Sequence, residues 1–287
     1  TTDTAQYSIG LGTTALDAIT TGDMNVAIGY NALTAQTSGH KSVGIGAYAL
    51  ETSDTGYYNT AIGTYTCQNL VGGYNNVAVG QGSMRATDNA IGNTAVGHWA
   101  LAAVTDQVGN VAVGNLAGED CVSANNTLIG YEAGLNNTSG ADNTAVGFKA
   151  MGAGITTGAN NTAIGSQSGK AITDGYENTF VGQDTALIAT SAFRNVCVGE
   201  ESGNNLTSGS KNVLIGTYDD QVSTGINNVL IGQAAGNGIT TQTGNMLIGG
   251  GCGSNCTGNY NVAMGINITI SSGSDNVFLG RVAGGQA

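Results

Sequence analysis

A glycine recurs along the whole chain at a nearly constant spacing, each time at the end of a short apolar run. Sixteen intervals separate these anchor glycines; ten of them have the same length and the others lie within two residues of it. A fixed period of this length, about 17 residues, is typical of solenoids, in which each short unit stacks on the next. The anchors are Gly10, Gly29, Gly46, Gly63, Gly80, Gly97, Gly114, Gly130, Gly147, Gly165, Gly182, Gly199, Gly216, Gly232, Gly249, Gly265 and Gly280.

The residues before each anchor glycine are equally regular. Asn stands four residues ahead in fifteen of the seventeen copies, with Gln6 and Ser42 as the exceptions. Val or Thr follows, then Ala, Leu or Phe, then Ile or Val. We expect these positions to define the repeat structurally. Representative copies are Asn25, Ile28 and Gly29; Asn59, Ile62 and Gly63; Asn76, Val79 and Gly80; Asn143, Val146 and Gly147; and Asn212, Ile215 and Gly216.

The apolar run of each copy predicts a short β-strand. β-Branched residues favour strands, the run is too short for a helix, and the chain has no proline to interrupt backbone pairing. Successive strand residues point to opposite faces, so Val26 and Ile28 share one face and Ala27 the other. Both faces are apolar, so one must line the coil interior and the other needs cover from a further strand layer or a partner subunit.

Stacking these coils predicts an all-β fold, a parallel β-solenoid or β-roll of about 17 coils, forming one repetitive domain over residues 1–287. Three or four aliphatic side chains buried in each coil would contribute roughly 1.5–3 kcal/mol each. We expect the anchor glycine to adopt a positive φ or allow close backbone approach, and Asn to tolerate the left-handed region. Stacked Asn amides would form a ladder, and seventeen coils would span on the order of 80 Å.

The composition bears on partners and location. Seven Lys and Arg against 19 Asp and Glu give a net charge of −12, which disfavours nucleic acid as a partner. No 20-residue apolar stretch is present, so membrane insertion is not expected. The repeat runs to both ends of the sequence without a charged cap. We therefore expect it either to continue into other segments or to stack end to end on copies of itself.

The motif resembles the 17-residue repeats of bacteriophage tail fibres, the kind that often carry an endosialidase-type chaperone. The best matches are residues 25–39, 59–73, 76–82 and 143–158. The core Val-Ala-Ile-Gly is also similar to the shorter head repeats of YadA-like trimeric autotransporter adhesins. This resemblance implies a left-handed β-roll that assembles as a homotrimeric fibre, with the second apolar face of each strand meeting neighbouring subunits. The chaperone domain itself has no counterpart in the sequence.

Few residues suggest chemistry. His40 and His98 occupy different positions of non-adjacent repeats, and the acidic doublets at Glu119, Glu200 and Asp219 are interpreted as solvated surface carboxylates. Five scattered cysteines, including Cys252 and Cys256, lack the spacing of a zinc site. We therefore predict no catalytic residue, no metal site, no cofactor and no enzymatic activity. A polysaccharide-degrading β-helix of the tailspike type is the alternative, since paired carboxylates hydrolyse glycosidic bonds.

Aromatic residues near the anchors offer a stacking surface for sugars. Tyr30, Tyr131 and Phe148 directly follow an anchor glycine, and Trp99 follows one residue later. A flat threonine array for ice binding is a further interpretation. Threonines align in four consecutive copies, but valine and methionine replace them afterwards, which predicts an interior position. The aligned residues are Thr127, Thr144, Thr162 and Thr179, followed by Val196, Val213, Val229 and Met246.

Together these observations favour a structural role. We expect a fibre shaft or adhesin of a virion tail or cell surface that is extracellular, pairs with copies of itself, and presents or forms a surface for a carbohydrate or another receptor. A self-assembling extracellular filament of stacked solenoids is the alternative within the same class.

Overall fold

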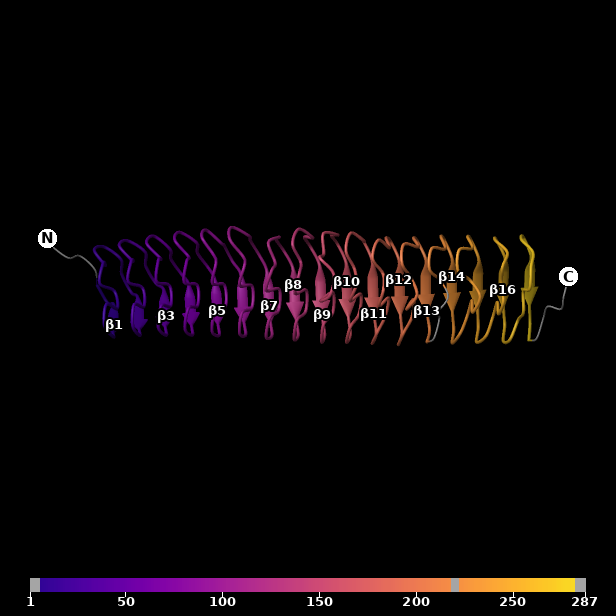
Figure 1. Cartoon of the computed structure of the whole chain (residues 1–287), viewed down its shortest axis with the longest axis horizontal. Helices are drawn as coiled ribbons and strands as arrows, with labels where there is room; N and C mark the ends of the chain where they lie inside the picture. Colours follow the sequence, from indigo (N-terminus) through magenta and orange to yellow (C-terminus); the bar gives the residue numbers. More distant parts are fainter. Residues whose placement is uncertain (1–5, 218–221, 282–287) are drawn as a thin grey trace. The chain divides into compact units, whose positions relative to one another are not determined.

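The computed structural model describes residues 6–217 and 222–281. Within them the chain is all-β and divides into two compact units, Thr1–Asp142 and Asn143–Ala287. The first unit holds β1 to β8 and the second β9 to β17, each strand three residues long (Figure 1). The strands are β1 (Ile9–Leu11), β2 (Val26–Ile28), β3 (Val43–Ile45), β4 (Thr60–Ile62), β5 (Val77–Val79), β6 (Thr94–Val96), β7 (Val111–Val113), β8 (Thr127–Ile129), β9 (Thr144–Val146), β10 (Thr162–Ile164), β11 (Thr179–Val181), β12 (Val196–Val198), β13 (Val213–Ile215), β14 (Val229–Ile231), β15 (Met246–Ile248), β16 (Val262–Met264) and β17 (Val277–Leu279).

Consecutive strands in each unit pair in parallel, and equivalent residues of successive copies lie opposite each other. In the first unit Val26 lies opposite Val43, which in turn lies opposite Thr60. In the second unit Thr162 lies opposite Thr179, as the repeat requires. One strand per copy, paired with the copies before and after it, makes each unit a parallel β-solenoid whose coils correspond to the sequence repeat. The predicted fold class is confirmed at this level.

In the first copy of the repeat, the anchor glycine is not the one that the sequence predicted. Gly10 pairs with Ala27 in the middle of the strand, so it is not the anchor. Gly12 takes that place, with a φ of 137° next to Gly29, and the interval to Gly29 then equals the commonest repeat length. The residue that replaces the buried Asn in this copy is therefore Ser8, whose hydroxyl accepts a hydrogen bond from the Asn25 amide at 3.1 Å.

Only the central residue of each strand faces the coil interior. Ala27, Ala61 and Leu128 are fully buried, whereas the flanking Val, Thr and Ile residues point outward and are half-buried or exposed. Of the two apolar strand faces, the one formed by the central residues therefore lines the interior, and the one that carries the Val, Ile and Thr side chains runs along the outer face of each unit. The interior is filled by the small or large central residue and by side chains from the turns that follow the strand, such as Leu33.

The anchor glycine is required for two independent reasons. At Gly182 the φ is 139°, a conformation that L-residues rarely adopt, and a Cβ there would lie 2.3 Å from the carbonyl oxygen of Gly199 in the next coil. In the turn that follows the anchor glycine, residues with a left-handed backbone alternate with residues of negative φ. After Gly29, for example, Asn31 and Leu33 are left-handed and Ala32 between them is not. The two left-handed residues donate to neighbouring coils, Asn31 to Thr13 of the preceding coil and Leu33 to Ala49 of the following one, whereas Ala32 between them donates to Gly29 of its own coil.

A ladder of buried asparagines runs beside the strands in each unit, as predicted. The side chain of Asn178 donates to Asn161 Oδ1 at 2.9 Å and to the Ala192 carbonyl at 2.7 Å. Its own Oδ1 accepts from the backbone and side-chain nitrogens of Asn195 at 3.0 and 3.1 Å. The prediction that Asn adopts the left-handed region is wrong by one residue, because the positive φ belongs to the residue before it, for example Glu177.

Candidate functional site

Two features of the surface differ from a plain polar exterior, and the first is the outer face of the strands. We call the first and third residues of each strand the outer stripe. In both units these positions hold only Val, Ile, Thr, Met and Leu, with no charged residue among the seventeen described strands. Several remain well exposed, including Val96 and Val113 at 37% and Met264 at 45%. Apolar surface that stays uncovered over many adjacent strands marks an interaction surface.

The rim beside the outer stripe is polar. The residue before each buried Asn, or before Ser42 in its place, is exposed or half-buried and is often charged, as at Lys41, Glu177, Arg194 and Lys211. Arg194 Nε and Glu177 Oε2 form an ion pair at 2.6 Å across adjacent coils. An apolar centre with a charged, hydrated rim is the usual anatomy of a protein–protein interface.

The threonine column belongs to this outer stripe, which corrects the sequence interpretation. Thr144, Thr162 and Thr179 lie in register on three consecutive strands of the second unit and are half-buried on the outer face. Their expected interior position is wrong, because the strand interior takes only the central residue. From Val196 onward the column is no longer threonine, so the regular array is short.

The four aromatic residues expected to form a sugar-stacking surface do not act as one group. Tyr30 is exposed and its ring meets that of Tyr48 edge to face, with centroids 5.3 Å apart. Tyr131 and Phe148 are exposed and belong to different units. Of the four, Trp99 lines the pocket described next.

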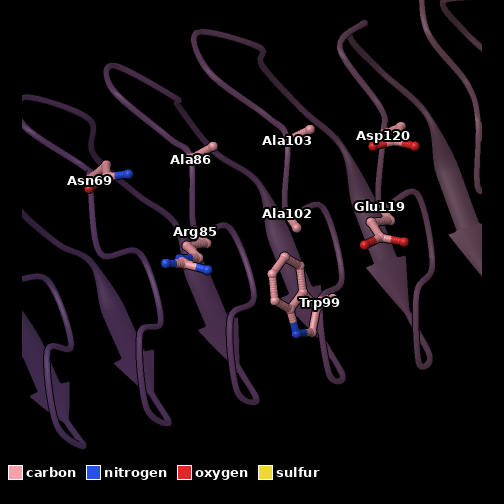
Figure 2. A pocket seen from close by; sticks show the side chains of 8 residues that line it. All are labelled: Asn69, Arg85, Ala86, Trp99, Ala102, Ala103, Glu119 and Asp120. Carbon is pink, nitrogen blue, oxygen red and sulfur yellow. The ribbon is translucent and has the colours of Figure 1, made fainter.

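The Trp99 pocket is the second feature, a surface cavity of about 370 Å³ in the first unit. Figure 2 shows Arg85 and Glu119 on opposite sides of Trp99 and Ala102. Alanines form the floor between them, so the two charged ends are separated by an apolar slot. The lining residues are Asn69, Arg85, Ala86, Trp99, Ala102, Ala103, Glu119 and Asp120.

Arg85 is held in place by its neighbours along the coil axis. Its Nε donates to Gln68 Oε1 at 3.2 Å, and Gln68 Nε2 donates to Glu51 Oε2 at 2.8 Å. The guanidinium carbon also lies 5.3 Å from the ring centre of Tyr65 and 5.6 Å from that of Trp99, within the range of cation–π attraction. The guanidinium at this end of the pocket is therefore held in position by contacts within the protein.

The opposite end of the pocket carries two consecutive carboxylates, Glu119 and Asp120. Partial burial, followed by repulsion from Asp120, raises the pKa of Glu119 above its ordinary value. The nearby His98 acts in the opposite direction and lowers the pKa of Glu119, whereas Glu132 raises it. Sequence analysis had interpreted the Glu119 doublet as a solvated surface feature, and it had not singled out Arg85 at all.

The cysteines, histidines and remaining acidic residues considered in the sequence analysis do not form a functional site in the described residues. All five cysteines are buried and unbridged, and burial raises the pKa of the Cys67 thiol to about 12. Within the described residues no three His, Cys, Asp or Glu side chains gather as they would around a metal ion, and no helix is long and apolar enough to cross a membrane. His40 stacks on Tyr57 in the first unit, far along the chain from His98. Asp219 and Asp220 lie outside the described residues.

No protein-family model matches the chain, and the search of curated proteins finds no match for it.

Proposed function

We propose that the chain is a structural fibre segment that associates with copies of itself through the outer stripe. The observation that carries this proposal is the uncovered apolar face of the strands, repeated from coil to coil in each unit. A half-exposed Val or Ile on every strand loses water contact only when another surface covers it. A partner built from the same repeat offers the matching spacing along its whole length.

A homotrimer is the assembly we propose. This stoichiometry is the one implied by the resemblance to trimeric adhesin heads and tail-fibre repeats, in which the second strand face meets neighbouring subunits. Apolar stripes from three chains would meet at a common centre, and the charged rim would remain in water. The role that follows is a shaft or adhesin of a virion tail or cell surface, placed outside the cell.

Features of the repeat support a mechanical role. Backbone groups of strands and turns bond to the coils before and after, and a buried Asn ladder adds side-chain bonds along the same axis. Solenoid stability accumulates as a sum over neighbouring repeats. This construction suits a segment that holds its form against force.

The test is the mass of the purified chain in solution, measured by light scattering and by sedimentation equilibrium. We expect three times the chain mass of 28.5 kDa. A double variant, Val96→Lys with Val113→Lys, places two charges on the outer stripe and should give a folded species of lower mass. Its matched control is Asn89→Lys with Thr105→Lys, which adds the same charges at exposed positions outside the stripe and should leave the mass unchanged.

Two results would contradict the proposal. One is a wild-type protein that sediments as a monomer at micromolar concentration. The other is a trimer that survives the Val96 and Val113 charges while circular dichroism shows an intact β-fold. An open series of masses that grows with concentration would favour the end-to-end filament instead.

A further inference from the structure

We propose that the Trp99 pocket binds one ring of a saccharide. The inference does not depend on the self-association proposed above, because the pocket is built from the turns after the strands and not from the outer stripe. Its volume of about 370 Å³ falls within the roughly 300–1,000 Å³ of small-molecule sites.

The pocket arises where a regular column of side chains is interrupted. Residues five positions after the anchor line up along the axis, one from each coil: Glu51, Gln68, Arg85, Ala102 and Glu119. Glu51, Gln68 and Arg85 are joined by hydrogen bonds, and Ala102 then leaves a gap one coil wide. The side chains of the neighbouring column, six positions after the anchor, are also small here, at Ala86 and Ala103. The gap lies between Arg85 and Glu119, which are two coils or roughly 10 Å apart at the usual strand spacing.

The wall of this gap is the only tryptophan in the chain. Gly82 of the preceding coil makes room for the Trp99 ring, because a Cβ there would lie 3.3 Å from its Cε2 atom. An indole ring offers a flat apolar surface with a negative π face, which suits the C–H groups on one side of a pyranose ring. The alanine floor adds apolar contact and no competing polar group.

The two ends of the pocket select against a simple ion. Arg85 can only donate hydrogen bonds, and the ionised Glu119 and Asp120 can only accept them. An anion would pair with Arg85 but be repelled by the carboxylates, and a cation would meet the reverse situation. A sugar hydroxyl both donates and accepts, so one ring with hydroxyls around its edge satisfies both ends. Asn69 adds an amide that can do either.

The arrangement favours binding over hydrolysis. Glycosidases place their two carboxyl groups on either side of the bond that is cleaved. Glu119 and Asp120 are consecutive residues at the same end of the pocket, and a guanidinium occupies the other end. A bound ring would therefore be held without a second carboxylate across from the first.

Trp99 makes the test direct, because intrinsic tryptophan fluorescence reports on this pocket alone. The full chain is titrated with the methyl pyranosides of glucose, galactose, N-acetylglucosamine and glucuronate, and with free lysine, which carries both a carboxylate and ammonium groups. We expect a saturable change in fluorescence with at least one neutral pyranoside. Arg85→Gln should weaken that binding about tenfold, as expected for loss of a charge-assisted hydrogen bond.

The sharpest variant is Ala102→Gln, which continues the Glu51–Gln68–Arg85 column and fills the slot. It should abolish binding while the protein remains folded by circular dichroism. The matched control, Tyr131→Ala, removes an exposed aromatic residue outside the pocket and should leave binding unchanged. The proposal is overturned if no saccharide gives a saturable response, if only lysine does, or if Ala102→Gln binds as tightly as the wild type.

Discussion

The side chain of Leu128 fills the space that a side chain at Gly134 would occupy. A Cβ built on Gly134 would lie 2.5 Å from Leu128 Cδ2, although both residues belong to the same coil. In coils whose strand centre is alanine the relation is reversed, as with Ala27 and the fully buried Leu33. The strand centre and the turn thus share one interior volume, and either of them can fill it.

This relation predicts a compensating pair of substitutions. Leu128→Ala should lower the free energy of unfolding by about 2–5 kcal/mol, because it leaves a cavity. Adding Gly134→Leu should recover more than half of that loss, since Leu33 already adopts a left-handed φ of 51° at the equivalent position. Urea unfolding followed by circular dichroism measures both. Leu128→Ala with Gly92→Leu is the control, because open space surrounds Gly92; recovery there would contradict the shared-volume explanation.

The asparagine ladder predicts a graded response at Asn178. Asn178→Ala leaves the buried backbone N–H of Asn195 without its acceptor, which should cost about 1–3 kcal/mol. The Asn195 side-chain amide also loses one acceptor but keeps its bonds to the carbonyls of Phe193 and Gly209. Asn178→Ser should lower the free energy of unfolding by less than Asn178→Ala does. Serine occurs naturally at the ladder position 42, where its hydroxyl accepts from the Asn59 amide at 3.3 Å. An unfolding midpoint of Asn178→Ala equal to that of the wild type would show that the ladder contributes little.

Features repeated in every coil could be predicted from sequence, because each copy reports on them independently. The parallel register, the anchor glycine and the Asn ladder belong to this group. The direction in which strand side chains point could not be predicted, since both faces of Val26, Ala27 and Ile28 are apolar. The first anchor was misplaced because Gly10 and Gly12 both end plausible runs; the pairing of Gly10 with Ala27 and the repeat-length interval from Gly12 to Gly29 identify Gly12.

The Trp99 pocket could not be predicted by scanning for motifs, because it depends on departures from the repeat. Arg85, Ala102 and Glu119 are distant in sequence, and none belongs to a recognisable catalytic or binding motif. Because each is one repeat after the last, stacking the coils places them in one column. Aligning the copies and looking for an interruption in a polar column would have found the pocket, whereas the search for aromatic residues near the anchors identified Trp99 without its neighbours Arg85 and Ala102.

The anchor glycines should tolerate no side chain. Gly182→Ala combines a forbidden φ of 139° with a contact of 2.3 Å to the Gly199 oxygen, so we expect destabilisation above about 4 kcal/mol. Gly92→Ala is the matched comparison, with a φ of 66° and open space, and should cost only about 1–2 kcal/mol. Chemical denaturation of the two variants gives the difference. Similar midpoints would mean that the backbones of adjacent coils lie farther apart at Gly182 and Gly199 than they do in the structure.

The cysteines should be unreactive while the chain is folded. Burial raises the pKa of Cys67 to about 12, and the pKa values of Cys121, Cys252 and Cys256 are also raised by burial. Because the thiolate is the reactive form, labelling with a thiol reagent at neutral pH should be slow in buffer and rapid in denaturant. Fast labelling of Cys67 in buffer, read out by mass spectrometry of its peptide, would contradict the closed packing of the first unit.

Glu119 predicts a pH-dependent stability difference. Its pKa in the folded chain is raised above the ordinary value of 4.5 by burial and by Asp120. The protonated form is therefore favoured in the folded state, and that advantage is present below the unfolded pKa and lost as the pH rises through the folded pKa. Glu119→Gln keeps a neutral side chain at every pH. It should be more stable than the wild type at pH 7, and the difference should shrink toward zero as the pH falls below about 4.

The charges facing Glu119 decide how this difference is interpreted. Asp120 and Glu132 oppose its ionisation, His98 favours it, and Arg85 lies across the pocket. Glu200→Gln is the control, since it removes the same charge from an exposed site in the second unit and so reports the effect of net charge alone. Thermal unfolding of both variants between pH 4 and 8 should show a pH-dependent gain only for Glu119→Gln. Parallel curves for the two variants would mean that the pocket imposes no specific cost on the Glu119 charge.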